Sequence, residues 1–480
     1  MDHVTYKGID YEVKDDALDL KSKGIKDISE IQGLDELTKL KILFLSFNQI
    51  SEIKGLNKLI NLELLYLDNN QISRIQELDS LINLKALYLT ENKISEVQGL
   101  DKLTNLEILY LSFNQISEIK GLNKFVNLEQ LYLNNNHISR VQELNSLINL
   151  KALYLTKNRI SEVQGLDELT NLKILDLGFN QISEIKGLSM LVNLEHFYLN
   201  HNYISGIQGL DSLTNLKTLF LTKNNISEIQ GLDKLKNLEV LHIDFNQISE
   251  IKGLSKFVKL EQLYLHYNQI SEIQGLNSLI NLKLLILTDN KISVIKGLDN
   301  LIDLRVLYLR INQIEEIRGL ETLTKLKFLY LDKNKILEMK GMDKLVALEQ
   351  LYLESNQISR IQGLDALFNL KVISLNNNRI SEIRGLDTIV NLNIFSIENN
   401  NILEIKNLEK HINLTFLCIS NNPISEIKGL ATLVNLQVLK IGGTKISREL
   451  IEELGGLDSP DFAKDIKKFV VYCKKKILIL

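Results

Sequence analysis

The chain has 480 residues, of which 45% are hydrophobic and 24% charged, a globular composition that leaves little room for long disordered segments. Its 60 acidic and 56 basic residues give a net charge of -4, which argues against a generic nucleic-acid-binding protein because such proteins need a basic surface. Two cysteines, Cys418 and Cys473, are too few for a disulfide framework and suit a reducing compartment. Neither a signal peptide nor an apolar run long enough to span a membrane is visible, so we expect a cytoplasmic protein without a transmembrane segment.

The N-terminal residues are predicted to cap a repeat array. Residues 4–13 are expected to form a hairpin that turns at Lys7-Gly8. A degenerate first coil follows, in which Lys23 takes the position of an asparagine that recurs later. Because a terminal coil leaves its core open, residues 1–36 are interpreted as an N-terminal cap with this first coil.

Residues 37–447 contain a regular repeat. An asparagine recurs with a 22-residue period, eighteen times from Asn48 to Asn422, within the frame Leu-x-x-Leu-x-Leu-x-x-Asn-x-Ile-x-x-Ile-x-Gly-Leu. The Leu-x-Leu pair has the period of a short strand, and a 22-residue coil is too short for a strand and a full helix. We therefore expect an α/β solenoid of about 20 coils, with a parallel β-sheet on its concave face and 3₁₀ turns or extended chain on its convex face. The asparagines are interpreted as structural groups that satisfy backbone atoms of the turns.

This frame resembles the leucine-rich-repeat family, specifically its 22-residue class, which includes the regulatory subunit of protein phosphatase 1 and the bacterial internalins. The resemblance covers residues 17 to about 447. It implies a right-handed horseshoe that binds other proteins on its concave side. Since neither a signal peptide nor a cell-wall anchor is visible, the intracellular branch of the family is the closer one.

A second period lies over the first. The segment Phe-Asn-Gln-Ile-Ser-Glu-Ile-Lys-Gly-Leu recurs with a 66-residue step, and residues 47–112 and 113–178 agree at 53 of 66 positions. A three-coil block was therefore duplicated, and duplication alone can preserve similar surface residues. The phenylalanines that begin these segments are interpreted as turn packing: Phe47, Phe113, Phe179 and Phe245.

One column of the predicted concave sheet is rich in tyrosine. The residue between the last two leucines of the frame projects from this face, and ten of the fifteen tyrosines occupy it. Tyrosine is enriched at protein interfaces, although aromatic rings in register also simply stack along a sheet. The column becomes small and polar beyond Tyr352, which stacking alone does not require. We predict a partner-binding surface made of Tyr66, Tyr88, Tyr110, Tyr132, Tyr154, Tyr198, Phe220, Tyr264, Tyr308, Tyr330 and Tyr352.

Polar residues flank this column. Two positions on, the residues are short and polar, as in Asp68 and Thr90, and the second position of the frame alternates in sign, as ordinary solvation predicts. His242, Asp244 and His266 are expected within about 7 Å of one another on adjacent strands. Such a cluster is a weak metal-site candidate, and exposed polar surface is the favoured interpretation, so no cofactor is predicted.

Residues 448–480 are predicted to form a C-terminal capping helix and a basic tail. The helix is expected to begin at Ser459-Pro460. Its apolar face would comprise Phe462, Ile466, Phe469, Val470 and Cys473. The tail from Lys474 to Leu480 is expected to be disordered or packed rather than to anchor the protein to a membrane.

No nucleotide-binding loop, nucleophile elbow or zinc-protease motif is present. The leading hypothesis is a non-enzymatic, monomeric scaffold that binds a protein partner on the concave aromatic face. A phosphatase-regulating subunit is a variant of this hypothesis. Two alternatives belong to other classes: recognition of a glycan or small ligand, and a purely structural spacer.

Overall fold

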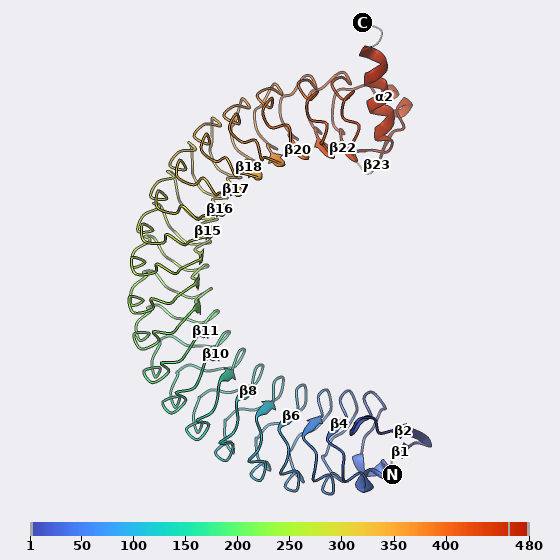
Figure 1. The fold of residues 1–480 in the computed structure, drawn as a ribbon, viewed down its shortest axis with the longest axis vertical. Coiled ribbons are helices and arrows are strands. Elements are labelled where there is room, and N and C mark those ends of the chain that lie inside the picture. Colours follow the sequence, from blue (N-terminus) through green and yellow to red (C-terminus); the bar gives the residue numbers. More distant parts are fainter. Residues whose placement is uncertain (1–2, 459–460, 478–480) are drawn as a thin grey trace. The chain divides into compact units, whose positions relative to one another are not determined.

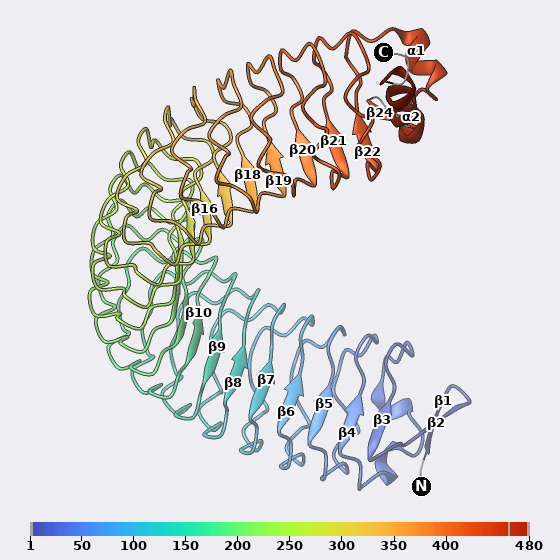
Figure 2. The ribbon, with the colours of Figure 1, turned by 45° about the horizontal axis from the view of Figure 1, so that its top comes forward.

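The computed structural model describes residues 3–458 and 461–477 of a chain that divides into two compact units, Met1–Leu241 and His242–Leu480. In each unit the coils stack into an arc, and short strands line its inner side (Figure 1). Figure 2 shows these strands lying side by side within each arc. The predicted solenoid, with its parallel sheet on the concave face, is confirmed for each unit.

The strands of the array are short and follow one another in 22-residue steps after β4. In unit 1 they are β3 Ala17–Asp19, β4 Ile42–Phe44, β5 Leu64–Tyr66, β6 Ala86–Tyr88, β7 Ile108–Tyr110, β8 Gln130–Tyr132, β9 Ala152–Tyr154, β10 Ile174–Asp176, β11 His196–Tyr198 and β12 Thr218–Phe220. Strand β13, Val240–His242, lies where the chain divides. In unit 2 they are β14 Gln262–Tyr264, β15 Leu284–Ile286, β16 Val306–Tyr308, β17 Phe328–Tyr330, β18 Gln350–Tyr352, β19 Val372–Ser374, β20 Ile394–Ser396, β21 Phe416–Cys418 and β22 Val438–Lys440.

The parallel register places equivalent residues of neighbouring coils opposite each other. Leu87 of β6 pairs with Leu109 of β7, and Tyr88 pairs with Tyr110. The middle residue of each strand is buried, whereas the aromatic residue after it is half-buried on the inner face. The repeat frame therefore decides which side chains line the core and which line the concave surface.

Outside the strands the chain is extended or turned. Single turns recur in each coil, as where the N–H of Leu59 donates to the carbonyl of Leu56 at 3.0 Å. Among the described residues, 3₁₀ helices are confined to η1 Ile28–Glu30 and η2 Leu34–Glu36 near the N-terminus. Gly99 shows why glycine recurs at the bend: its φ is +78°, and a Cβ there would clash with the carbonyl oxygen of Ile75.

The asparagine ladder has the structural role expected of it. Asn48 accepts hydrogen bonds through Oδ1 from the N–H groups of Lys23 and Ile25, at 2.9 and 3.0 Å. Its Nδ2 donates to the carbonyls of Leu20 and Leu45, both at 2.9 Å. One buried amide thus satisfies backbone groups in two successive coils, and this arrangement recurs along both units.

The N-terminal hairpin is confirmed. Strands β1 His3–Tyr6 and β2 Ile9–Glu12 pair antiparallel across Lys7-Gly8. Thr5 exchanges backbone hydrogen bonds with Gln32, at 3.0 Å in each direction, so the hairpin is attached to the first coil.

The C-terminal prediction was wrong in detail. Ser459 and Pro460, the predicted helix start, lie outside the described residues, as do residues 478–480 of the tail. Helix α2 spans Ile466–Ile477, and Phe462 lies in the strand β24 Phe462–Ala463, where its side chain is exposed. Strand β24 pairs antiparallel with β23 Leu457–Asp458 and with β22, so sheet pairing overrides the helical pattern. A short helix that the sequence did not predict, α1 Arg448–Glu453, comes before this hairpin.

The C-terminal part of the predicted apolar helix face is buried. Phe469, Val470 and Cys473 are at most 7% exposed. The Sγ atom of Cys473 lies 3.7 Å from the carbonyl oxygen of Ile427. Helix α2 therefore packs against the last coils of the array.

Candidate functional site

The predicted aromatic column lies at the ends of the inner strands. Each ring belongs to the last residue of its strand, directly after a buried leucine or phenylalanine, so it projects from the sheet next to its counterparts in the adjacent coils. Because the strands from β4 to β9 pair without a shift in register, rings on these successive strands meet face to face. The column is therefore set by the same frame that builds the core.

Unit 1 contains the longest stack. Six rings are stacked in consecutive coils, with centroid separations of 4.0 to 4.7 Å and interplanar angles of 6° to 24°. We call this set the six-ring stack; it consists of Phe44, Tyr66, Tyr88, Tyr110, Tyr132 and Tyr154. Asp176 takes the next position, so the stack ends after Tyr154. Beyond it, Tyr198 and Phe220 form a tilted pair 5.1 Å apart.

The column in unit 2 is broken into shorter pieces. His242 stacks on Tyr264 at 3.7 Å, and Ile286 follows in the column. Tyr308, Tyr330 and Tyr352 then form a three-ring stack, at 4.0 and 4.7 Å. Asp176 and Ile286 thus interrupt the predicted set of aromatic residues, which does not form one continuous stack.

Stacking decides which part of each ring a ligand can reach. The face of an interior ring such as Tyr110 is covered by Tyr88 on one side and Tyr132 on the other. The ring edges and phenolic oxygens remain on the inner surface. Such a surface suits apolar and polar contacts with a protein, whereas stacking of a sugar needs an uncovered ring face.

Two tyrosines of the six-ring stack, Tyr88 and Tyr132, remain neutral around physiological pH. Burial, followed by neighbouring tyrosines, raises the pKa of Tyr88 and of Tyr132 well above the ordinary range of tyrosine. The Oη of Tyr132 donates to Oε1 of Gln130 at 2.9 Å. The stack therefore carries phenolic hydroxyl groups along its edge.

Short polar residues flank the stack. Oδ1 of Asp68 accepts from the N–H of Thr90 at 3.0 Å, and Oδ1 of Asn134 accepts from the N–H of Thr156 at 2.9 Å. Burial raises the pKa of Asp68, although the hydrogen bond from Thr90 acts against the rise. These groups therefore join adjacent coils as well as lining the surface.

The alternating charges at the second position of the frame form ion pairs between coils. Lys85 contacts Glu63 at 2.7 Å, and Lys151 contacts Glu129 at 2.6 Å. Together with exposed asparagines they line a shallow groove of about 880 Å³ along one edge of unit 1. Exposed pairs of this kind contribute little to stability.

His242, Asp244 and His266 lie together in unit 2. Oδ1 of Asp244 is 3.6 Å from Nδ1 of His242, and Oδ2 is 3.4 Å from Nε2 of His266. Burial lowers the pKa of His266. Across residues 3–458 and 461–477, no set of three His, Cys, Asp or Glu side chains has an arrangement that could hold a metal ion.

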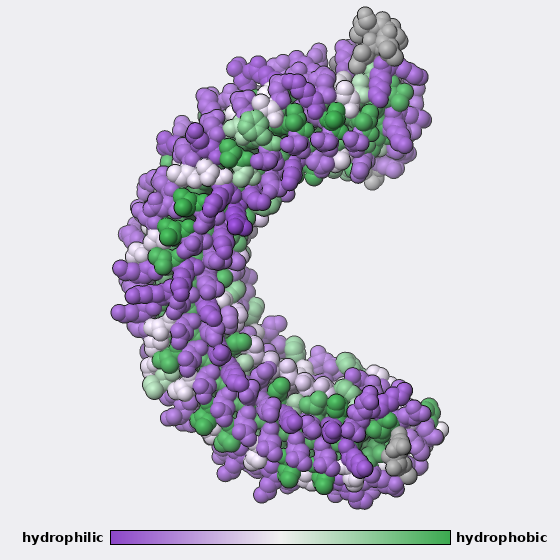
Figure 3. All heavy atoms as spheres, viewed as in Figure 1, coloured by the Kyte–Doolittle hydropathy of each residue, from purple (hydrophilic) through white to green (hydrophobic). Residues whose placement is uncertain are grey.

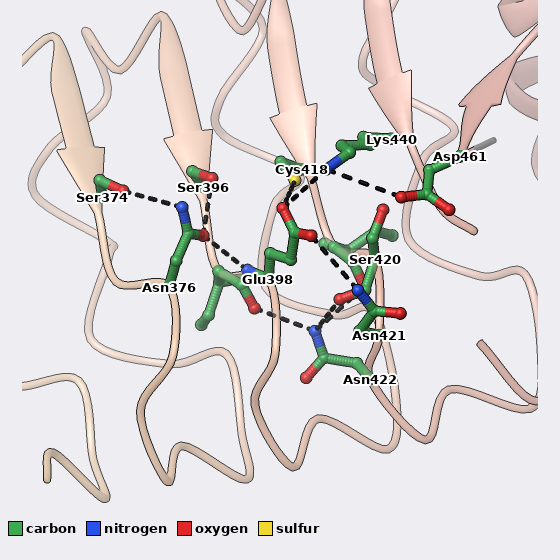
Figure 4. Close-up of polar contacts among 12 residues, drawn as sticks. Ser374, Asn376, Ser396, Glu398, Cys418, Ser420, Asn421, Asn422, Lys440 and Asp461 are labelled. Carbon is green, nitrogen blue, oxygen red and sulfur yellow. Dashed lines mark hydrogen bonds and ion pairs between the residues drawn. The ribbon is translucent and has the colours of Figure 1, made fainter. Parts of the chain in front are cut away.

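A polar network near the C-terminal end of unit 2 was missed from the sequence (Figure 4). Glu398 is its centre: Oε2 accepts from Nζ of Lys440 at 2.9 Å and from Sγ of Cys418 at 3.2 Å. Lys440 also lies 3.7 Å from Asp461, next to β24. Lys440 therefore links the last coils to the hairpin that follows them, and the network has a structural explanation.

The phenylalanines that mark the 66-residue period lie in turns, but they are less packed than predicted. Phe47, Phe113 and Phe179 have φ between 52° and 60°, a left-handed conformation, and their side chains are exposed. Phe179 stacks on His201 at 3.8 Å, and Phe245 stacks on Tyr267 at 4.2 Å. For Phe47 and Phe113 turn packing was the wrong interpretation, because these side chains are exposed, whereas Phe179 and Phe245 stack on rings of the next coil.

A second, exposed asparagine ladder was also missed. Nδ2 of Asn83 donates to the carbonyl of Ile60 at 2.9 Å, and Nδ2 of Asn369 donates to the carbonyl of Val346 at 2.8 Å. The signal was present in the sequence, since these asparagines also recur with the 22-residue period. These hydrogen bonds join adjacent coils in the segment that precedes each strand.

Comparison with known proteins gave a family match. A family model described as "Leucine Rich repeats (2 copies)" matches ten windows that together cover more than half of the chain. These windows are residues 38–80, 60–102, 82–124, 104–146, 126–168, 148–190, 192–234, 214–256, 236–278 and 302–344. No curated protein matches the chain.

Several solved structures are similar in fold. YopM from Yersinia enterocolitica is 22% identical with a TM-score of 0.65, covering 85% of this chain and 88% of its own. The functional domain of InlJ from Listeria monocytogenes is 22% identical with a TM-score of 0.60, covering 69% and 72%. The ectodomain of the receptor kinase GASSHO1/SCHENGEN3 from Arabidopsis thaliana, in complex with CASPARIAN STRIP INTEGRITY FACTOR 2, is 20% identical with a TM-score of 0.54, covering 86% and 62%. At these identities the likeness concerns the fold alone.

Within the described residues, none of the helices has the length and apolar character needed to cross a bilayer.

Proposed function

Because the chain belongs to the leucine-rich-repeat family, we propose that it is a non-enzymatic scaffold that binds a partner protein through the six-ring stack of unit 1. The continuity of that stack carries the proposal. Six half-buried aromatic side chains in consecutive coils provide a rigid contact surface that loses little conformational entropy on binding. The aromatic residues beyond it, from Tyr198 to Tyr352, form smaller contact areas of the same kind.

The geometry favours a protein over a glycan as the ligand. Interior rings of the stack present edges, hydroxyl groups and the short polar residues beside them, such as Thr90 and Asn134, rather than open ring faces. Hydrogen-bonding groups next to aromatic edges match the mixed character of protein interfaces. Among similar folds, the GASSHO1/SCHENGEN3 ectodomain is in complex with CASPARIAN STRIP INTEGRITY FACTOR 2.

We place this function in a reducing compartment and assign it to a monomer. Cys418 and Cys473 are both free and buried, so the protein needs no disulfide. We further propose that residues 1–36 and 448–480 serve as caps. The backbone bonds between Thr5 and Gln32 and the contact of Cys473 with Ile427 support that assignment.

The test is affinity capture from a lysate of the native organism, comparing wild type with the triple variant Tyr110→Ala, Tyr132→Ala, Tyr154→Ala. A matched control is Tyr308→Ala, Tyr330→Ala, Tyr352→Ala, which removes the three-ring stack of unit 2. The proposal is supported if wild type and the control capture a protein that the first variant does not capture. The thermal unfolding transition of the first variant must be unchanged, which shows that it is still folded. Equal capture by the first variant moves the site elsewhere, and no capture favours a structural spacer.

A further inference from the structure

Unit 2 carries an exposed apolar stripe outside the inner face. One side chain of each of five consecutive coils belongs to it, each directly following a buried residue of the core. We call this the edge stripe; it consists of Val346, Phe368, Val390, Ile412 and Val434, which are 45, 55, 41, 53 and 61% exposed. Figure 3 shows hydrophobic residues standing in rows among hydrophilic neighbours along the coils. A contiguous exposed row of this kind is uncommon on a monomer and marks an interaction surface.

The fold does not require apolar residues at this position. Thr104, Thr214 and Thr324 occupy it in other coils, and Lys236 does so in a fourth. The backbone is the same in either case: Nδ2 of Asn127 donates to the carbonyl of Thr104 at 3.1 Å, as Asn369 does to Val346 at 2.8 Å. The apolar character of the edge stripe therefore has no explanation within the coil.

Duplication does not explain the stripe either. In unit 1 the corresponding row is interrupted every third coil, by Thr104 and Thr170. The edge stripe is unbroken over five coils, and these coils lie beyond the segments that share the 66-residue repeat. Its members are valines, a phenylalanine and an isoleucine, so apolar character rather than one residue type is what they share.

The stripe is rigid before any partner binds. The carbonyls of Val346, Phe368 and Ile412 each accept a hydrogen bond from an asparagine of the next coil, at 2.8 to 3.0 Å. The core residues that precede them are almost completely buried. Little conformational entropy of the backbone remains to be lost on binding.

An acidic column runs beside the stripe. Asp343, Asp365, Asp387 and Glu409 occupy the same position in four successive coils and are exposed. Lys410 contacts Asp387 at 2.8 Å, and no salt bridge within the described residues involves the other three carboxylates. A partner with basic residues beside its apolar contact would complement this flank.

We propose that the edge stripe is the docking surface for an amphipathic α-helix with a basic flank, supplied by a partner protein. Paired strands are about 4.8 Å apart on the inner side of the arc and the coils diverge outward from it (Figure 1), so the five side chains span at least about 19 Å. A helix presents one apolar residue per turn of about 5.4 Å, which keeps it in near register over this length. An extended strand presents side chains on one face only at intervals of about 7 Å, so its side chains would not stay in register with the coils. This surface is separate from the six-ring stack, so either proposal can fail alone.

The probe is a fluorescent 18-residue peptide with Leu at positions 1, 5, 8, 12 and 15 and Lys and Ala elsewhere. Its binding to the full chain is followed by fluorescence anisotropy at low ionic strength. Two comparison peptides replace every Lys by Glu, or place Pro at the centre to break the helix. We expect saturable binding of the basic helix and binding weaker by roughly tenfold or more for both comparison peptides.

The decisive variant is Phe368→Ser, Val390→Ser, Ile412→Ser, which changes exposed residues only. Its matched control is Ile60→Ser, Ile82→Ser, Val126→Ser, at the same position of the interrupted row in unit 1. The proposal expects the first variant to lose roughly tenfold or more in affinity and the control to keep it. Three results overturn it: no saturable binding, equal binding of both variants, or equal binding of the acidic peptide. A fourth result would come from sedimentation velocity on the chain without peptide. If the chain is a dimer and only the first variant is a monomer, the edge stripe binds a second copy of this chain instead of a partner helix.

Discussion

Asn136 accepts, through Oδ1, a hydrogen bond at 3.0 Å from the backbone N–H of Ile116 in the preceding coil. Its Nδ2 donates to the carbonyls of Leu111 and Leu133, at 2.9 and 3.0 Å. These partners belong to two coils, and the amide that joins them is only 5% exposed. Each coil is therefore held to the next by a buried side chain as well as by the sheet.

Replacing this asparagine is predicted to destabilise the array. Asn136→Ala leaves the buried N–H of Ile116 without its partner, at a cost of about 1–3 kcal/mol. The carbonyls of Leu111 and Leu133 keep bonds from Asn114 and Asn158, so we expect a loss of roughly 2 kcal/mol in the free energy of unfolding, measured by urea denaturation. Asn127→Ala, which removes one exposed bond to Thr104, is the control and should cost less than about 1 kcal/mol. Equal losses would contradict a special role for the buried ladder.

Substitutions at two equivalent positions of the bend that usually contains glycine are predicted to change stability in opposite directions. Glu143 takes the glycine position with φ +59°, and a side chain in this conformation costs about 1–2 kcal/mol. Glu143→Gly is therefore expected to stabilise the protein by about 1 kcal/mol. Gly121→Ala is expected to destabilise it, because its φ is +79° and the new Cβ would clash with the carbonyl of Val97. Thermal unfolding followed by circular dichroism measures both, and a destabilised Glu143→Gly variant would show that the glutamate side chain has a compensating contact.

The structure of one coil was predictable because the 22-residue period specifies its strand, its core residues and its turn. The leucine spacing gives the strand and the core, and Asn48 and its equivalents give the turn, so the sheet and its inner column followed from the sequence. The stacking geometry of the rings did not follow, because it depends on side-chain rotamers, although interruptions such as Asp176 are visible in the sequence.

The C-terminal end was less predictable because its pairing is not local. Phe462 has helical spacing with Phe469, but its backbone lies in a strand opposite Lys440 of the last coil. The contact of Lys440 with Glu398, two coils apart, likewise has no signal in the repeat frame. Where periodicity ends, tertiary contacts decide the local structure.

Acid is predicted to destabilise unit 2 through His411. This side chain is 1% exposed at a core position that Ile389 and Leu433 take in the neighbouring coils, and its Nδ1 has no hydrogen-bond partner. Burial lowers the pKa of His411, although a bond to the carbonyl of Leu386 and the nearby Asp387 act against this. Because the unfolded chain binds a proton more readily, stability should fall as pH drops below about 6.5, the ordinary value for histidine. His411→Leu should flatten that fall between about pH 6.5 and 5 in urea denaturation; an unchanged slope would assign it to other groups.

The thiol of Cys418 is predicted to be unreactive in the folded protein and to be activated by a change at Glu398. Burial, followed by the Glu398 carboxylate at 3.2 Å, raises the pKa of Cys418 to about 11. Since only the thiolate reacts, alkylation by iodoacetamide at pH 8 should be roughly 100-fold slower than for a free cysteine. In a Cys473→Ser background, which leaves one thiol, Glu398→Gln removes the negative charge but leaves Lys440 nearby, so the pKa falls and alkylation accelerates. Glu354→Gln, in the same column two coils earlier, is the control, and equal rates in the two variants would mean that burial alone protects the thiol.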